Sequence, residues 1–244
     1  MKILGLDSSG LVATAAIVED GILLAEFTTN FKKTHSQTLL PMLDQIRGML
    51  DLDMNTIDAI AIAAGPGSFT GLRIGAATAK GLGLALDKPL VEVPTLEGLA
   101  YNLCGSTALV CPLMDARRNQ VYTGIYEFVK EEQEYVLNIV ETQCAVDITE
   151  IIARLNALGR EVVFLGDGVP VYRSIIEQNL TVPYSYAPAN NNRQRAASVA
   201  ALGAVYYRAG KMVSAAAHQP EYLRKSQAER EQEEKERALK QAEV

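Results

Sequence analysis

The chain has 244 residues, of which 48% are hydrophobic and 21% charged, and its formal net charge is −6. This length fits one large domain or two small ones with a substantial core, and no apolar run approaches the ~20 residues that a membrane span needs. Because a protein that binds nucleic acid on its own usually carries a basic face, the acidic balance argues against tight direct binding to RNA.

The amino-terminal part of the chain begins with three predicted strands. Residues 2–7 form a strand that ends in an acid, Asp7, and a polar turn leads to a second strand at residues 14–18. The dipeptide Asp20-Gly21 is a typical hairpin signal before a third strand at residues 22–27. Strands joined in sequence by tight turns predict an antiparallel meander.

A helix is expected next, starting at Thr34-His35-Ser36-Gln37 and running to about Leu50. Four large apolar residues fall on one face at helical spacing: Leu39, Leu43, Ile46 and Leu50. Leu40, Met42 and Met49 lie off that face, so the helix has a second apolar surface to cover. Pro41 is tolerated only in the first helical turn, which fixes the start of the helix to within several residues.

A glycine-rich loop follows the next predicted strand. The apolar run at residues 59–64 predicts a buried strand, and residues 65–75 read Gly-Pro-Gly-Ser-Phe-Thr-Gly-Leu-Arg-Ile-Gly before a helix. Gly65 and Gly67 allow close approach to the main chain, and the helix start offers N–H groups to an anion. The loop is therefore either a phosphate cradle or a well-made strand-to-helix turn. It matches neither the Walker pattern nor the dinucleotide fingerprint.

The helix after this loop carries a strip almost without side chains. Four small residues recur at every fourth position: Gly71, Gly75, Ala79 and Gly83. Because glycine costs roughly 0.5–1 kcal/mol relative to alanine inside a helix, the strip implies a close approach. Its neighbour is either the sheet beneath or another helix. A strand at residues 90–93 and a helix at residues 95–102 complete a β-β-β-α-β-α-β-α half.

A second block repeats this order of elements. Strands are predicted at residues 108–114, 121–128, 135–140 and 161–165, and helices at residues 147–158, 171–180 and 196–209. The shared order indicates a duplicated topology, although no sequence repeat has a fixed period. We divide the chain into a first half (1–103), a second half (104–225) and a charged carboxy-terminal helix or disordered tail (226–244).

The cysteines and the amino-terminal residues indicate in which cellular compartment the protein is expected. The three cysteines form no Cys-x-x-Cys pair, so we expect reduced thiols. The first residues, Met-Lys-Ile-Leu-Gly-Leu-Asp, lack a signal-peptide pattern. Both observations predict a cytoplasmic protein without a membrane contact.

A duplicated meander-α-β-α core with an acid at the end of the first strand resembles the actin/Hsp70/sugar-kinase (ASKHA) fold. We expect an α/β chain with two βββαβαβα-type halves, the second one reduced. Within that fold, the chain is most similar to the bacterial TsaB (YeaZ) family from Met1 to about Glu231. Four motifs carry this resemblance: Asp7-Ser8-Ser9, Thr34-His35-Ser36 with Leu39-Leu40-Pro41, the loop of residues 65–75, and Tyr-Leu-Arg-Lys-Ser-Gln-Ala-Glu-Arg-Glu at residues 222–231.

The resemblance implies a non-catalytic role in a tRNA-modifying complex. Members of this family support their paralogue TsaD, together with the ATPase TsaE, in attaching threonylcarbamoyl to the adenosine next to the tRNA anticodon. TsaD holds a metal through a His-x-Glu-Gly-His motif, and this chain has Thr95-Leu96-Glu97-Gly98-Leu99 there. Neither Thr nor Leu replaces imidazole as a ligand. We expect no catalytic residue, no metal and no cofactor of the chain's own, and leave open ATP or ADP at an interface of the complex.

The resemblance also marks a degenerate nucleotide site. Asp7, Ser8 and Ser9 stand at the phosphate turn of the fold, and Gly65 and Gly67 belong to the loop that faces it. A capped turn without ligand is the alternative. The corresponding turn of the second half reads Asp-Ala-Arg-Arg at residues 115–118, which we interpret as a solvated turn and not an RNA contact.

The surplus apolar surface of the two first-half helices predicts a partner interface. The residues assigned to it are His35, Leu39, Met42, Leu43, Arg73 and Ala79. Two adjacent helices of this kind pack against the same pair of a second chain as a four-helix contact, which predicts a homodimer when the chain is alone. The resemblance implies that TsaD uses the same patch and that tRNA is reached only through the complex.

Two other functions draw on the same residues. A small ATP-dependent phosphotransferase of the sugar-kinase fold would use Asp7 and the glycine-rich loop, but the second phosphate loop is missing. A metallopeptidase would need a cluster of metal ligands that the sequence does not supply. ATP turnover and metal content of the purified chain separate these three functions.

Overall fold

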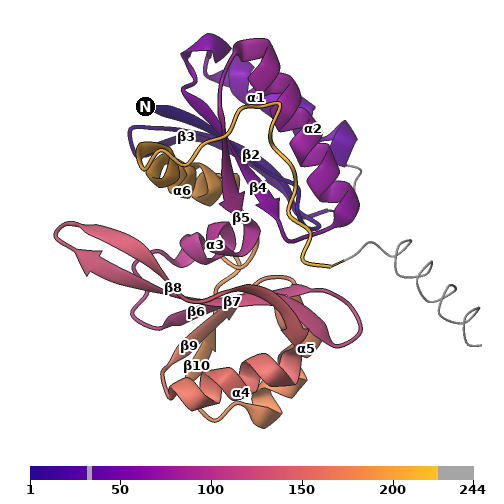
Figure 1. Cartoon of the computed structure of the whole chain (residues 1–244), viewed down its shortest axis with the longest axis vertical. Helices are drawn as coiled ribbons and strands as arrows, with labels where there is room; N and C mark the ends of the chain where they lie inside the picture. Colours follow the sequence, from indigo (N-terminus) through magenta and orange to yellow (C-terminus); the bar gives the residue numbers. More distant parts are fainter. Residues whose placement is uncertain (32–34, 225–244) are drawn as a thin grey trace, which may run out of the picture.

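The computed structural model describes residues 1–31 and 35–224 and consists of two halves stacked end to end, each built on one sheet (Figure 1). The predicted tail at residues 226–244 and the helix start at Thr34 lie outside the described residues. Within the described residues, no helix is long and apolar enough to cross a membrane.

The first sheet has the strand order β3-β2-β1-β4-β5. Its strands are β1 (Lys2–Asp7), β2 (Ala13–Glu19), β3 (Ile22–Thr29), β4 (Ala59–Gly65) and β5 (Leu90–Pro94). Strands β1, β2 and β3 run antiparallel, which confirms the predicted meander, and β4 and β5 continue the sheet in parallel. Every residue of β4 is buried, because helices cover both faces of the sheet.

The second sheet repeats this topology with the order β10-β9-β6-β7-β8. Its strands are β6 (Leu109–Asp115), β7 (Gln120–Glu131), β8 (Glu134–Asp147), β9 (Val162–Leu165) and β10 (Tyr184–Tyr186). The meander of β6, β7 and β8 is again antiparallel, and β9 and β10 are parallel to β6. The duplicated α/β fold predicted from the sequence is confirmed, and β10 is an element that the sequence reading missed.

Two helices cover one face of the first sheet and one covers the other. On the first face lie α1 (Leu39–Met49) and α2 (Phe69–Leu86), and on the opposite face lies α6 (Ala196–Arg208). The second sheet has α4 (Ile148–Leu158) and α5 (Gly168–Asn179) on one face, and α3 (Thr95–Ala100) packs between the halves. Since α6 follows β10 but packs on the first sheet, the second half keeps fewer helices of its own.

The first helix begins where its proline allows. A 3₁₀ turn at His35–Gln37 precedes α1, and Pro41 lies in the first turn of the helix, as predicted. Leu39, Leu43 and Ile46 point into the core of the first half, so the predicted apolar face of this helix is also confirmed.

The small-residue strip of α2 faces inward. A Cβ atom on Gly75 would lie 2.6 Å from the Ser8 Oγ, one on Gly71 would collide with the Ser8 carbonyl, and Ala79 is completely buried. The strip therefore lets α2 lie directly on the sheet and on the turn after β1. The alternative, a flat contact for a neighbouring helix, is wrong for these residues because all four are buried within the chain.

Residues 211–224, here called the C-terminal strap, return along the first half after α6. The strap pairs with β5 through reciprocal bonds between Val213 and Leu90, and the Lys80 ammonium donates to two of its carbonyls. Its last described residue, Arg224, donates to the Ala116 carbonyl in the second half. Figure 1 shows this orange-yellow segment crossing the first half and ending beside the junction of the halves.

Candidate functional site

The turn after β1 is buried and holds an acid. The Asp7 carboxylate accepts the Ser9 main-chain N–H over 2.7 Å, and the Ser8 hydroxyl donates to the Gly71 carbonyl over 2.9 Å. All three side chains of Asp7, Ser8 and Ser9 are at most 2% exposed. Burial raises the pKa of the Asp7 carboxyl to about 6, although the bonds from Ser9 oppose this shift. Asp7 is therefore an acid whose charged form the fold disfavours.

The glycine-rich loop closes directly on this turn. The Ser68 N–H donates to the Ser9 carbonyl over 2.6 Å, and the Ser68 hydroxyl accepts the Gly71 N–H and so caps α2. A Cβ on Gly67 would collide with the Ser9 main chain. These donors are directed at protein atoms, which favours the strand-to-helix turn over a phosphate cradle. Nucleotide binding at Asp7, Ser8, Ser9, Gly65 and Gly67 stays a prediction.

The C-terminal strap covers the same loop from outside. Gly65 has a φ of +125°, and a Cβ atom there would collide with the Glu221 carbonyl. The Glu221 N–H donates to the Ala64 carbonyl over 2.7 Å, and the Tyr222 ring packs on Phe69 with 4.8 Å between centroids. The loop is thus held between the turn after β1 and the strap.

Two side chains support the turn from the side. The His35 Nε2 lies 2.9 Å from the Gly10 carbonyl oxygen, so His35 fixes the turn within its own chain, while its role in a partner interface stays a prediction. Gln194 is 1% exposed and packs against Gly10. The sequence reading missed Gln194, because it lies in an irregular segment far along the chain and no local pattern connects it to residues 7–10.

Residues 95–99 stand where TsaD has its metal-binding motif, and in this chain they contact other residues of the core. Thr95 is fully buried, and its hydroxyl accepts the Gly65 N–H over 3.1 Å, while Leu99 belongs to the core between the halves. Glu97 accepts a hydrogen bond from the Tyr206 hydroxyl, and burial raises the pKa of this carboxyl. In the part of the chain that the structure describes, no three His, Cys, Asp or Glu residues gather into a possible metal site.

The predicted partner interface needs a correction. Leu39, Leu43 and Ala79 are at most 4% exposed and form part of the first-half core, so they offer no surface to a partner. Helical periodicity identifies an apolar face but does not say whether a sheet or a second chain covers it. Met42 is half-buried and Arg73 exposed, and their role at an interface stays a prediction.

Other residues of the same helices are exposed instead. Leu40, Met49 and Leu84 are 50%, 72% and 64% exposed, and a Cβ atom added to Gly48 or Gly81 would meet open space. We call Gly48, Met49, Gly81 and Leu84, together with the exposed Ala77, the α1/α2 outer face; Leu40 lies on the opposite side of α1 from Met49, because nine residues make two and a half helical turns. This face combines large apolar side chains with glycines that no neighbour among the described residues requires.

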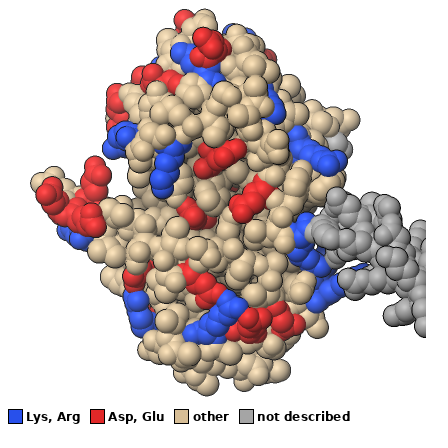
Figure 2. Space-filling model, in the orientation of Figure 1, with Lys and Arg blue, Asp and Glu red and all other residues tan. Residues whose placement is uncertain are grey.

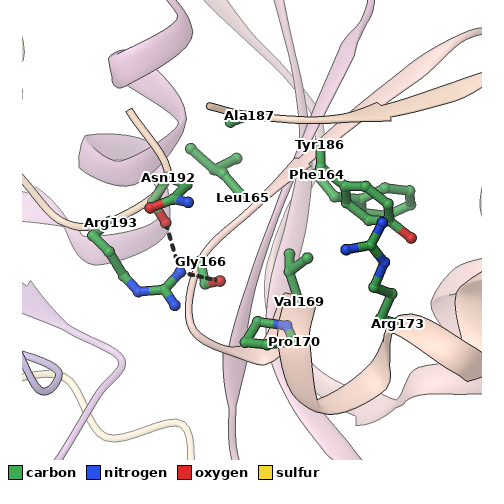
Figure 3. Close-up of a pocket in the computed structure, with 10 residues that line it drawn as sticks. All are labelled: Phe164, Leu165, Gly166, Val169, Pro170, Arg173, Tyr186, Ala187, Asn192 and Arg193. Atoms are coloured by element: carbon green, nitrogen blue, oxygen red, sulfur yellow. Dashed lines mark hydrogen bonds between the residues drawn. The ribbon is translucent and has the colours of Figure 1, made fainter. Parts of the chain in front are cut away.

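A pocket of about 330 Å³ lies in the second half (Figure 3). Its floor is apolar and is formed by the end of β9 and the first turn of α5. Arg173 stacks over the Tyr186 ring at 4.7 Å, and the Arg193 guanidinium donates to the Gly166 and Asn192 carbonyls. No predicted site residue lines this pocket, because it is formed by two segments that lie apart in sequence, residues 164–173 and 186–193.

Comparison with known proteins gives one family. The family model described as "TsaD: tRNA N6-adenosine threonylcarbamoyltransferase" matches residues 23–232. The chain is 32% identical to the tRNA threonylcarbamoyladenosine biosynthesis protein TsaB of Bacillus subtilis, over 94% of this chain and 96% of that protein. It is 31% identical to the Escherichia coli protein of the same name, over 69% and 72% of the two chains. Among solved structures, YeaZ from Pseudomonas aeruginosa superposes with a TM-score of 0.76 at 25% identity, over 91% of this chain and 99% of that chain.

Proposed function

The chain belongs to the TsaB family of tRNA threonylcarbamoyladenosine biosynthesis proteins, and we propose that it serves this process as a non-catalytic subunit that scaffolds and activates TsaD together with TsaE. The residues at the motif positions support the non-catalytic assignment. Thr95 and Leu99 replace two ligand histidines, and both are engaged in packing and hydrogen bonding within the core. Threonine and leucine do not serve as zinc ligands in proteins.

The observation that carries the partner role is the α1/α2 outer face. Gly81 lies in the fourth turn of an 18-residue helix, where glycine costs roughly 0.5–1 kcal/mol relative to alanine. Among residues 1–31 and 35–224, no atom lies within 4 Å of a Cβ atom added to Gly81, so no contact with these residues requires that glycine. A second backbone that packs on α2 would require it. Leu84 and Met49, the most exposed apolar side chains of this face, would be buried by the same contact.

When the chain is alone, a two-fold contact between two copies buries the α1/α2 outer face. One patch then meets its own copy, so α1 and α2 of two protomers form a four-helix contact and a homodimer. TsaD replaces one copy in the complex. The match of the TsaD family model includes both α1 and α2, which supports a common helix pair in the two proteins. A stable interface of standard size would cover roughly 800 Å² on each partner.

Nucleotide and tRNA belong to the complex in this proposal. The donors of the glycine-rich loop already bind the turn after β1, so the chain needs no cofactor of its own, and ATP or ADP is held at an interface that includes TsaE. The chain works in the cytoplasm, where its tRNA substrate is found. Most tRNA affinity then comes from the partner subunits, since the net charge of this chain is −6.

Reconstitution with one component omitted at a time tests the function. Purified TsaD, TsaE, this chain, tRNA and the threonylcarbamoyl adenylate should give modified tRNA, and leaving out this chain should reduce the yield strongly. The chain alone should give none. Modification without TsaD would contradict the non-catalytic role, and turnover of ATP onto sugars by the chain alone would favour the phosphotransferase.

A further inference from the structure

The second half carries a two-stranded arm that reaches away from the rest of the molecule (Figure 1). The arm consists of residues 126–139, in which β7 and β8 pair antiparallel around a turn at residues 132–133. We call it the β7–β8 arm. Its base is anchored, because Phe128 and Leu137 pack into the core between the halves. The arm is therefore held in place while its free end stands in the surroundings.

The outer edge of β8 is open. β8 stands at the end of its sheet, and among residues 1–31 and 35–224 no element other than β7 makes a main-chain hydrogen bond with residues 134–142. An open edge presents a row of N–H and C=O groups on which another strand can pair, and proteins often protect such edges with proline or lysine. β8 has neither residue type in its 14 positions. Residues 134–142 provide roughly 30 Å of edge at about 3.3 Å per residue.

Exposed apolar side chains accompany this edge. Val136 and its cross-strand partner Val129 are 42% and 43% exposed, and Ile139 and Val140 are 42% and 36% exposed. All four are β-branched, and such residues pack well against β-branched or aromatic residues of a neighbouring strand. A strand added beside β8 would cover the side chains of Val136, Ile139 and Val140 with its own.

The free end of the arm is acidic. Glu131 and Glu134 are cross-strand partners, and Glu132 lies in the turn between them. Like charges directly opposite each other in a sheet are destabilising. Two bases lie in this region, Lys130 on the arm and Arg208 of α6, but no ion pair among the described residues joins either base to the three carboxylates. Figure 2 shows acidic side chains, in red, on the arm at the left edge of the molecule.

We propose that the outer edge of β8 binds an extended segment of a partner protein that alternates apolar and basic residues and adds a further strand to the second sheet. Main-chain groups of the edge supply the pairing, the exposed apolar side chains contact every second residue of the segment, and the acids at the end of the arm pair with its Lys or Arg. A second copy of this chain fits less well. β8 contains no base, so pairing of β8 with itself would place no opposite charge beside Glu134. The interface uses no residue of the α1/α2 outer face and does not depend on the proposed function.

Fluorescence anisotropy of the full-length chain with labelled synthetic peptides tests the proposal. The probe is a peptide of about ten residues, the length of a long strand, that alternates valine and lysine. One control peptide alternates valine and glutamate, and another has the probe sequence with every main-chain nitrogen methylated, which keeps the charges and removes the donors. The test variant of the chain is Glu132→Gln/Glu134→Gln. The control variant, Asp51→Asn/Asp87→Asn, removes the same charge from two exposed acids of the first half, both at positive φ, where asparagine is tolerated.

The valine–lysine peptide should bind and slow hydrogen exchange in residues 134–142, whereas the acidic and the methylated peptides should not bind. The test variant should bind the probe about three- to tenfold more weakly, and the control variant should keep the wild-type affinity. No binding of the probe, equal binding of the methylated peptide, or equal affinities of the two variants would overturn the proposal. A Leu84→Glu chain that stays dimeric in light scattering and becomes monomeric when the probe is added would assign the edge to a second copy instead.

Discussion

Replacing Asp7 by Asn should stabilise the protein at neutral and alkaline pH. The Asp7 carboxylate is buried, and desolvation raises its pKa from the ordinary 3.8 to about 6. Asparagine keeps the oxygen that accepts the Ser9 N–H and removes the buried charge. Below the pKa of the unfolded chain both states carry the proton, so the native state bears no penalty there. As the pH rises through 4 to 6, the unfolded chain releases its proton first and stability falls.

The size of the effect follows from this shift. A difference of about two pKa units between the folded and unfolded states corresponds to about 3 kcal/mol at 1.36 kcal/mol per unit. Asp7→Asn should therefore raise the free energy of unfolding by up to about 3 kcal/mol at pH 8 and by almost nothing at pH 4.

Urea unfolding of the wild type and the variant at pH 4, 6 and 8 measures this difference. Asp58→Asn is the matched control, because Asp58 also accepts a main-chain N–H, that of Lys2, near the start of the same strand. The gain should grow with pH for Asp7→Asn and should not appear in the control. A gain that is independent of pH, or a loss at pH 8, would refute the assignment of a buried, desolvated carboxylate.

Four further outcomes follow from the structure. Ala79→Glu should prevent stable folding, as soluble yield and circular dichroism will show, because this side chain is completely buried. Glu26→Gln should lower the free energy of unfolding by about 1–3 kcal/mol in urea, since Glu26 binds both Arg195 and the Ala197 N–H and so ties α6 to β3. Elemental analysis of the purified chain should find no stoichiometric metal, and zinc or iron at one equivalent would contradict the non-catalytic role. At physiological salt the chain alone should bind tRNA more weakly than about 1 µM in filter binding, and tighter binding would show that its partners are not the main source of affinity.

Patterns that depend on neighbours in sequence predicted the fold well. The two meanders, the buried strand β4, the glycine-rich turn and the inward face of α1 all follow from local periodicity and turn residues, and the structure confirms them. The three-residue strand β10 was missed because so short a segment carries no period, and its pairing with β9 is set by the rest of the sheet.

The site was harder to predict because its contacts are not local. The small-residue strip of α2 predicts that another backbone packs closely on this helix. Only the structure shows that this backbone is the turn at Ser8 of the same chain. Leu84 and Gly81 belong to no sequence motif. Their exposure depends on which part of α2 the rest of the fold covers, and this cannot be derived from neighbouring residues in the sequence. Phe69 and Tyr222 belong to motifs that the sequence did single out, yet nothing in either motif indicates that the strap brings them together.

The affinity of the chain for a TsaD partner tests the central proposal most directly. Leu84→Glu places a charge on the α1/α2 outer face, and Val171→Glu places the same charge on α5 in the second half, where the parent side chain is 57% exposed. Titration calorimetry with TsaD should show binding weakened about a hundredfold or more for Leu84→Glu, and light scattering should show this variant as a monomer. Val171→Glu should behave as the wild type in both measurements. Wild-type affinity for TsaD in Leu84→Glu would contradict the role of this face in the complex.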